Sequence, residues 1–115
     1  MPDGIDVVHG RIFWTDMGNP KAPDGSVSSA KLDGTDIRTL VSNGQVFTPK
    51  QLIADEKDRK LYFCDREGGR VFRCDLDGHD LEVLVQTADY REKTLTEMDW
   101  CVGIAISKKL GKVCR

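Results

Sequence analysis

The stretch IFWTD, at residues 12–16, places an aromatic pair between an aliphatic residue and a threonine, and an aspartate closes it. A similar stretch, LYFCD, follows at residues 61–65. Two copies of one uncommon pattern are more typical of a repeated structural unit than of a single catalytic site. The pair therefore points first to architecture.

A longer repeat surrounds these two stretches. Residues 26–41 (SVSSAKLDGTDIRTLV) align without gaps on residues 70–85 (RVFRCDLDGHDLEVLV), with seven of sixteen positions identical. Upstream, residues 2–16 match residues 49–65 once a turn two residues longer is allowed. The last thirteen residues of the chain repeat the beginning of the unit again. The sequence thus holds one unit, a second unit and the first half of a third.

Each complete unit is predicted to contain four short strands. Apolar or aromatic runs mark these strands at 5–8, 12–15, 27–31 and 37–41, again at 52–54, 61–64, 71–75 and 81–85, and once more at 104–106. Asp33-Gly34 and Asp77-Gly78 separate the third and fourth runs, and Asp-Gly is a strong hairpin signal because glycine accepts a positive φ. Four-stranded units of about 40 to 50 residues are typical of β-propeller blades. The predicted fold class is all-β.

The aromatic runs resemble the YWTD repeat of low-density-lipoprotein-receptor class B modules. The first copy is Phe13-Trp14-Thr15-Asp16 and the second is Tyr62-Phe63-Cys64-Asp65, and the Leu-Asp-Gly turns fit the same pattern. The resemblance covers nearly the whole chain. It is closest to the intracellular microbial members, which lack the receptor's flanking cysteine-rich modules.

This resemblance implies a six-bladed propeller in which the aromatic pairs pack between adjacent blades. It also implies that the closing aspartate accepts hydrogen bonds from the backbone of its own or a neighbouring blade. We expect one blade at 2–41, a second at 48–85 and the first half of a third at 100–115. The second copy departs from the pattern at Phe63 and Cys64, and the third loses the aromatics and the aspartate.

Two and a half blades do not close a ring, because closed propellers have about four to eight blades. An open arc leaves an unpaired blade face at each end. We therefore expect the segment to be part of a longer propeller, whose remaining blades are its first partners. Self-association through the open faces into a ring is one alternative, and a truncated product without function is another.

Composition excludes several classes of function. The chain has 115 residues and a formal net charge of −2, without the basic stripe of a nucleic-acid-binding protein. It has no apolar run long enough for a membrane span and no visible signal peptide, so we expect a cytoplasmic protein. Its four cysteines form no CxxC pair, so we expect reduced thiols and no zinc.

Several chemical interpretations compete with structural ones. Residues 75–80 are rich in carboxylates, but glycine stands fourth rather than sixth, which favours a hairpin over a calcium loop. Asp16 and Asp65 occupy equivalent positions in different units, which favours structural acceptors over an acid–base pair. Cys64 and Cys74 flank one hairpin loop, so a disulfide between facing strands competes with buried thiols.

Binding residues are expected where loops converge at the mouth of the propeller channel. The loops before the first strands and after the second strands supply these candidates: Asp3, Lys50, Gln51, Arg66, Glu67 and Trp100. The predicted function is a non-catalytic scaffold for an unknown protein or small-molecule ligand, without cofactor or metal. The alternative is part of a propeller hydrolase of the lactonase type, with its site at the channel mouth.

Overall fold

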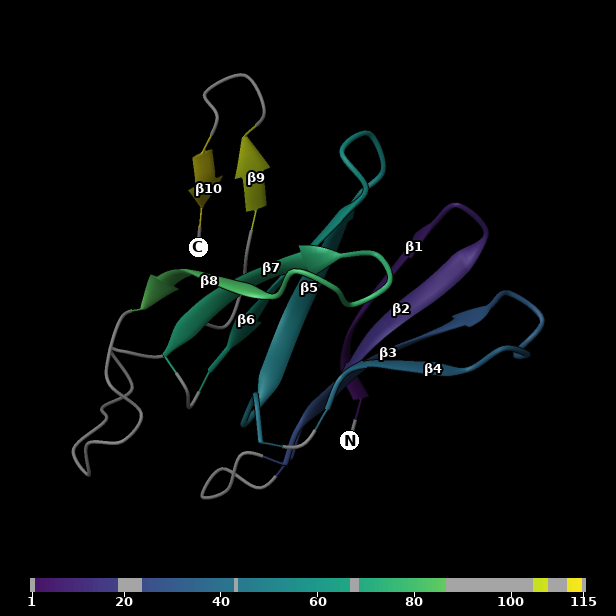
Figure 1. Ribbon diagram of the computed structural model, residues 1–115, viewed down its shortest axis with the longest axis horizontal. Coiled ribbons are helices and arrows are strands. Elements are labelled where there is room, and N and C mark those ends of the chain that lie inside the picture. Colours follow the sequence, from purple (N-terminus) through teal and green to yellow (C-terminus); the bar gives the residue numbers. More distant parts are fainter. Residues whose placement is uncertain are drawn as a thin grey trace.

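The computed structural model describes residues 2–18, 24–42, 44–66, 69–86, 105–107 and 112–114. Its described part contains two four-stranded antiparallel sheets and one two-stranded sheet (Figure 1). The strands are β1 (Pro2–Val8), β2 (Arg11–Asp16), β3 (Ser26–Lys31), β4 (Arg38–Val41), β5 (Pro49–Asp55), β6 (Lys60–Asp65), β7 (Arg70–Asp75), β8 (Glu82–Gln86), β9 (Ala105–Ser107) and β10 (Lys112–Cys114). The prediction of four-stranded antiparallel blades is confirmed.

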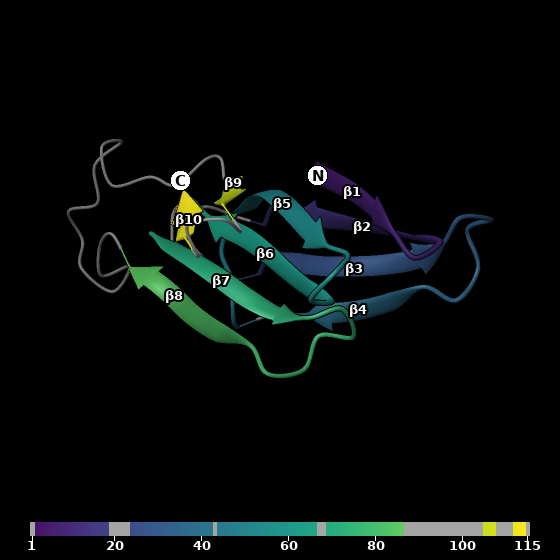
Figure 2. The same ribbon diagram turned by 90° about the horizontal axis from the view of Figure 1, so that it is seen from above.

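The two large sheets are stacked face to face. In both, strands that are consecutive in the chain are neighbours in the sheet. Figure 2 shows β1 and β5 on one side of the stack and β4 and β8 on the other. We call the sheet β1–β4 the first blade and the sheet β5–β8 the second blade.

The apolar core lies between the two blades. Side chains alternate along a strand, so Phe13 and Thr15 of β2 face the second blade. Leu61 and Phe63 of β6 face back toward the first, and the Phe63 ring stacks on Phe72 with centroids 5.2 Å apart. The buried residues of this core are Val8, Phe13, Val27, Val41, Val46, Leu52, Leu61, Phe63, Phe72 and Cys74.

The first strands of the two blades, β1 and β5, lie so close together that one position requires glycine. A Cβ atom on Gly4 of β1 would stand 2.4 Å from the carbonyl oxygen of Lys50 on β5. The hydroxyl of Thr15, which is fully buried, joins the same two strands. It accepts the Gly4 N–H at 2.8 Å and donates to the Lys50 carbonyl at 2.5 Å. The YWTD-type threonine thus connects the two blades at the inner strands.

Asp65, the closing aspartate of the second motif, anchors the connection between the blades. Its carboxylate accepts the N–H groups of Phe47 at 3.2 Å and Thr48 at 2.8 Å, in the segment that leads into β5. Arg70 donates to the same carboxylate at 3.0 Å and to the carbonyl of Gln45, also at 3.0 Å. Because Asp65 is fully buried and Arg70 nearly so, the ion pair is shielded from water.

The Asp-Gly turns close the outer hairpin of each blade in the same way. Gly34 and Gly78 have φ values of 84° and 89°, in the left-handed region that glycine tolerates. Asp33 accepts the backbone N–H of Thr35 at 2.9 Å, and Asp77 accepts the N–H two residues further on at 3.1 Å.

The disulfide hypothesis for Cys64 and Cys74 is wrong. Cys64 pairs with Val71 across the ladder and Cys74 pairs with Leu61, so they are not opposite one another. They also lie on opposite faces of the second blade, since Cys74 belongs to the core between the blades and Cys64 to the cluster on the far face. Both are buried cysteines that form no disulfide.

Replacing Asp65 by asparagine should lower the free energy of unfolding by about 2–4 kcal/mol. The amide keeps the shape of the side chain but leaves Arg70 buried without a counter-charge and loses one acceptor. Urea denaturation measures the effect. The control Glu56→Gln removes an exposed charge and should change stability by less than about 0.5 kcal/mol. Equal stability of the two variants would contradict the assigned role of Asp65.

Cys74 should resist alkylation in the folded chain. Burial raises the pKa of its thiol to about 12, so almost no thiolate is present at pH 8. We expect iodoacetamide to modify Cys64 and Cys74 only after denaturation, because both thiols are also inaccessible. Peptide mapping by mass spectrometry identifies the modified cysteines. Native labelling of Cys74 at the rate of the denatured chain would show that this core is open.

Candidate ligand-binding cleft

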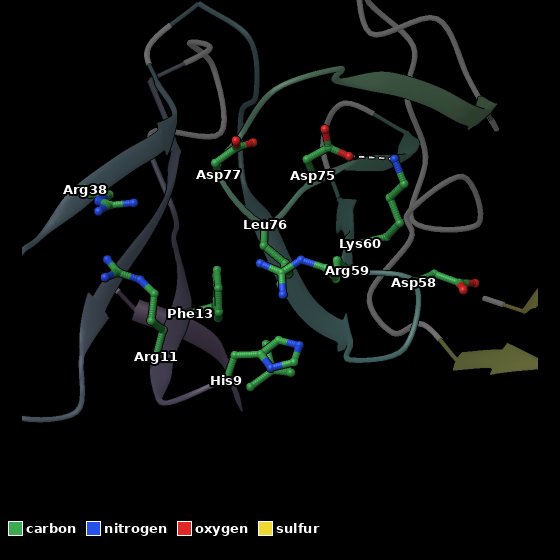
Figure 3. A pocket seen from close by; sticks show the side chains of 11 residues that line it. His9, Arg11, Phe13, Arg38, Asp58, Arg59, Lys60, Asp75, Leu76 and Asp77 are labelled. Atoms are coloured by element: carbon green, nitrogen blue, oxygen red, sulfur yellow. Dashed lines mark hydrogen bonds and ion pairs between the residues drawn. The ribbon is translucent and has the colours of Figure 1, made fainter.

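A cleft of about 450 Å³ lies between the two blades (Figure 3). It is found where the β1–β2 turn, the β5–β6 turn and the β7–β8 turn meet, at one end of the strands. Its lining consists of Val8, His9, Arg11, Phe13, Arg38, Asp58, Arg59, Lys60, Asp75, Leu76 and Asp77. We call it the inter-blade cleft.

The floor of the inter-blade cleft is apolar. Val8 and Phe13 reach it from the inner strands of the first blade, where both are buried in the core. Leu76 reaches it from the β7–β8 turn and packs against the same core. The cleft is therefore the end of the blade-to-blade core, left open between turns.

Two arginines of the first blade line one wall of the cleft, and both form ion pairs with the same carboxylate. Arg11 donates to a carboxylate oxygen of Asp36 at 2.9 Å, to the Asp36 carbonyl at 2.8 Å and to the Ser29 hydroxyl at 3.0 Å. Arg38 pairs with the same carboxylate at 2.9 Å. Hydrogen bonds from Arg38 and Arg11 hold the pKa of Asp36 below its ordinary value of 3.8.

The second blade supplies the opposite wall. Lys60, the first residue of β6, pairs with Asp75 at the end of β7, at 2.5 Å. The hydrogen bond between them raises the pKa of Lys60 and lowers the pKa of Asp75, so both stay charged over a wider pH range. Asp77 lies beside them in the turn and pairs with the exposed His79 at 3.2 Å.

The predicted binding residues lie at the other end of the strands. Asp3 and Lys50 come together there, in an ion pair of 3.1 Å between β1 and β5. Gln51 is exposed next to Lys50, and the backbone N–H of Arg66 donates to the Thr48 carbonyl at 3.1 Å. Two further candidates, Glu67 and Trp100, lie outside the described residues. Among the predicted binding residues that the structure describes, Asp3 and Lys50 are therefore the two that form an ion pair with each other.

Sequence reasoning missed the inter-blade cleft. One signal was present, because Arg11 and Lys60 are both basic and both begin the second strand of their units. The longer β5–β6 turn, which carries Arg59, was a second signal. Neither signal indicated that turns from two blades would meet to form the inter-blade cleft.

Comparison with known proteins identifies the repeat. Residues 10–46 match the family model of the low-density lipoprotein receptor repeat class B. This segment is a low-density lipoprotein receptor class B repeat. The matched segment contains the first YWTD-type motif and the first Asp-Gly hairpin, so the resemblance seen in the sequence is confirmed.

Two fungal relatives match over nearly the whole chain. Low-density lipoprotein receptor-related protein 1 of Pyricularia oryzae is 43% identical over 120 residues, covering 98% of this chain and 39% of the relative. The 3-hydroxyacyl-CoA dehydrogenase-like protein LAM1 of Cochliobolus heterostrophus is 48% identical over 117 residues, covering 98% of this chain and 25% of the relative. The class B repeat chain thus spans between a quarter and two-fifths of these proteins, and their names describe the whole relatives.

A solved structure has the same fold. A chain in the crystal structure of a nidogen/laminin complex superposes with a TM-score of 0.64 at 24% sequence identity, over 75% of this chain and 31% of that one. This likeness confirms the β-propeller fold of the two blades. No helix long and apolar enough to cross a membrane occurs in the part of the chain that the structure describes.

The carboxylate of Asp36 should titrate below its ordinary pKa of 3.8, because Arg38 and Arg11 stabilise its charged form. A folded-state pKa below the unfolded one adds stability that is present above the unfolded pKa and lost as pH falls through the folded pKa. Carbon-13 NMR of the carboxyl group measures the midpoint. Arg38→Ala should raise that midpoint, whereas Arg73→Ala should leave it unchanged. A midpoint unaffected by Arg38→Ala would contradict the pairing.

Proposed function

We propose that this class B repeat chain is a non-catalytic binding module that works as part of a larger, six-bladed propeller and binds a protein partner. The observation that carries the proposal is the outer face of the first blade, the side of β1–β4 that points away from the second blade. This outer face has the pattern of a blade-to-blade interface but no blade covers it among the described residues.

The internal repeat identifies what this outer face is built to do. Ile5 pairs with Trp14 across β1 and β2, and Leu52 pairs with Phe63 at the equivalent positions of β5 and β6. Leu52 and Phe63 are buried against the first blade, with 3% and 0% exposure. Ile5 is 69% exposed and Trp14 is half-buried. The same positions therefore form a covered interface in one blade and an open one in the other.

The outer face also has room for a side chain from a covering blade. A hollow of about 310 Å³ is lined by Asp3, Gly4, Ile5 and Trp14. Val7, on the same face of β1, is 53% exposed. Stacked repeat units gain stability mainly from contacts with their neighbours, so exposed apolar residues at interface positions favour a further blade.

Three observations support the proposal: the first favours binding over catalysis, and the other two favour a protein as the partner. The pKa values of Asp36, Asp75 and Lys60 are moved away from neutrality, the opposite of what a general acid or base needs. The propeller with the same fold was solved in a nidogen/laminin complex, which is an assembly of proteins. The inter-blade cleft, bordered by three turns, combines an apolar floor with charged walls and is open to a segment of a partner.

The double substitution Ile5→Lys with Val7→Lys should remove the apolar character of the outer face. We expect it to reduce both the binding of an anilinonaphthalene dye and concentration-dependent self-association of the isolated chain, with little change in melting temperature, because both side chains are exposed. Dye fluorescence and light scattering measure the two effects.

Val83→Lys is the matched control, since Val83 is 46% exposed but lies on β8 of the second blade. Equal dye binding by the control and the double variant would argue against the outer face as an interface. A large fall in melting temperature of the double variant would instead mean that Ile5 and Val7 already contribute to a core.

A further inference from the structure

We propose that Arg59 anchors a carboxylate-binding site in the inter-blade cleft, which takes an acidic side chain from an extended peptide segment of a partner. This inference rests on the proposed function, because it names the chemistry by which the module would recognise a protein. It concerns the end of the strands opposite the predicted channel-mouth residues.

Arg59 differs from the other basic residues of the cleft in its pairing. Arg11 and Arg38 are both engaged by Asp36, and Lys60 is engaged by Asp75. Among the residues that the structure describes, the exposed Arg59 side chain lines the cleft without an ion pair or hydrogen bond. Its five N–H donors remain available in the planar fork that matches a carboxylate.

The backbone at Arg59 is in an unfavourable conformation. Its φ is 56°, in the left-handed region, which a residue with a long side chain seldom adopts. The other described non-glycine residues with positive φ are His9, Asp36 and Asp80, whose residue types are enriched there. In the corresponding turn of the first blade the residue before β2 is Gly10, with φ 74°. An arginine at this glycine-like position costs stability, and such strain concentrates at functional sites.

The surroundings of Arg59 determine the class of ligand. Figure 3 shows its side chain beside Leu76, directed toward the middle of the cleft and toward the wall with Arg11. Phe13 and Leu76 belong to the apolar floor of the same cleft. On the opposite wall, Lys60 offsets the charge of Asp75. Two further carboxylates belong to the lining: Asp77, which lies 3.2 Å from the imidazole of His79, and Asp58. In a partner segment with one acidic side chain next to an aliphatic one, the carboxylate pairs with the guanidinium and the aliphatic side chain packs against the apolar floor.

A phage-displayed library of short random peptides, panned on the 115-residue chain, tests this assignment. We expect enrichment of peptides with Asp or Glu beside an aliphatic residue. Replacing the acidic residue of a selected peptide by its amide should weaken binding about tenfold or more, because a charge-assisted hydrogen-bond pair is lost. Enrichment of basic peptides, or failure to enrich acidic ones, would overturn the proposal.

Arg59→Gly separates recognition from folding. Glycine removes the guanidinium and also relieves the left-handed strain. We expect the selected acidic peptides to bind about tenfold or more weakly to this variant, while its melting temperature is unchanged or higher. A lower melting temperature would assign Arg59 a structural role and overturn the proposal, and so would unchanged peptide binding.

Lys57→Ala is the matched control for charge. Lys57 belongs to the same turn and is exposed, but it does not line the cleft. Its loss should leave peptide affinity within about twofold, since exposed charges contribute weakly. A loss equal to that of Arg59→Gly would show a general electrostatic effect and contradict a specific site. Self-association through the outer face is measured without peptide, so the two proposals fail independently.

Discussion

A single four-stranded sheet has two faces and cannot bury either of them by itself, so every blade depends on a neighbour. Among the described residues, one such interface is present, in which Phe13 and Val27 of the first blade pack against Leu61, Phe63 and Phe72 of the second. Burial of apolar surface between blades is the dominant favourable term. The positions of the turns, and hence of the inter-blade cleft, follow from this contact.

Buried polar contacts fix the position of one blade relative to the other, which apolar packing alone would define less well. Thr15 joins the inner strands of the two blades, and Asp65 holds the segment that leads into β5. Each of these groups lacks contact with water, so leaving it unpaired would be costly. The two motif residues therefore select one arrangement of the blades, while the aromatic and aliphatic residues supply most of the stability.

The two blades share a framework and differ at their turns. The motif aromatics and the Asp-Gly hairpins recur in register, because each blade needs the same strands and the same packing layer. The turn before the second strand differs, with His9-Gly10 in one blade and a longer turn ending in Arg59 in the other. This difference affects no core residue, and it places a cation at a cleft. The exposed turn can thus change its charge without loss of the fold.

The amino-acid sequence by itself determined the four-stranded antiparallel blade and the class B repeat. These features depend on local alternation, turn chemistry and a repeat that can be aligned. The tertiary structure decided which face each side chain occupies. It separated Cys64 from Cys74, exposed Ile5 where the equivalent Leu52 is buried, and brought turns of two blades around one cleft. The physical reason is that these outcomes depend on which surface packs against which neighbour, and the separation of residues along the chain does not encode that choice.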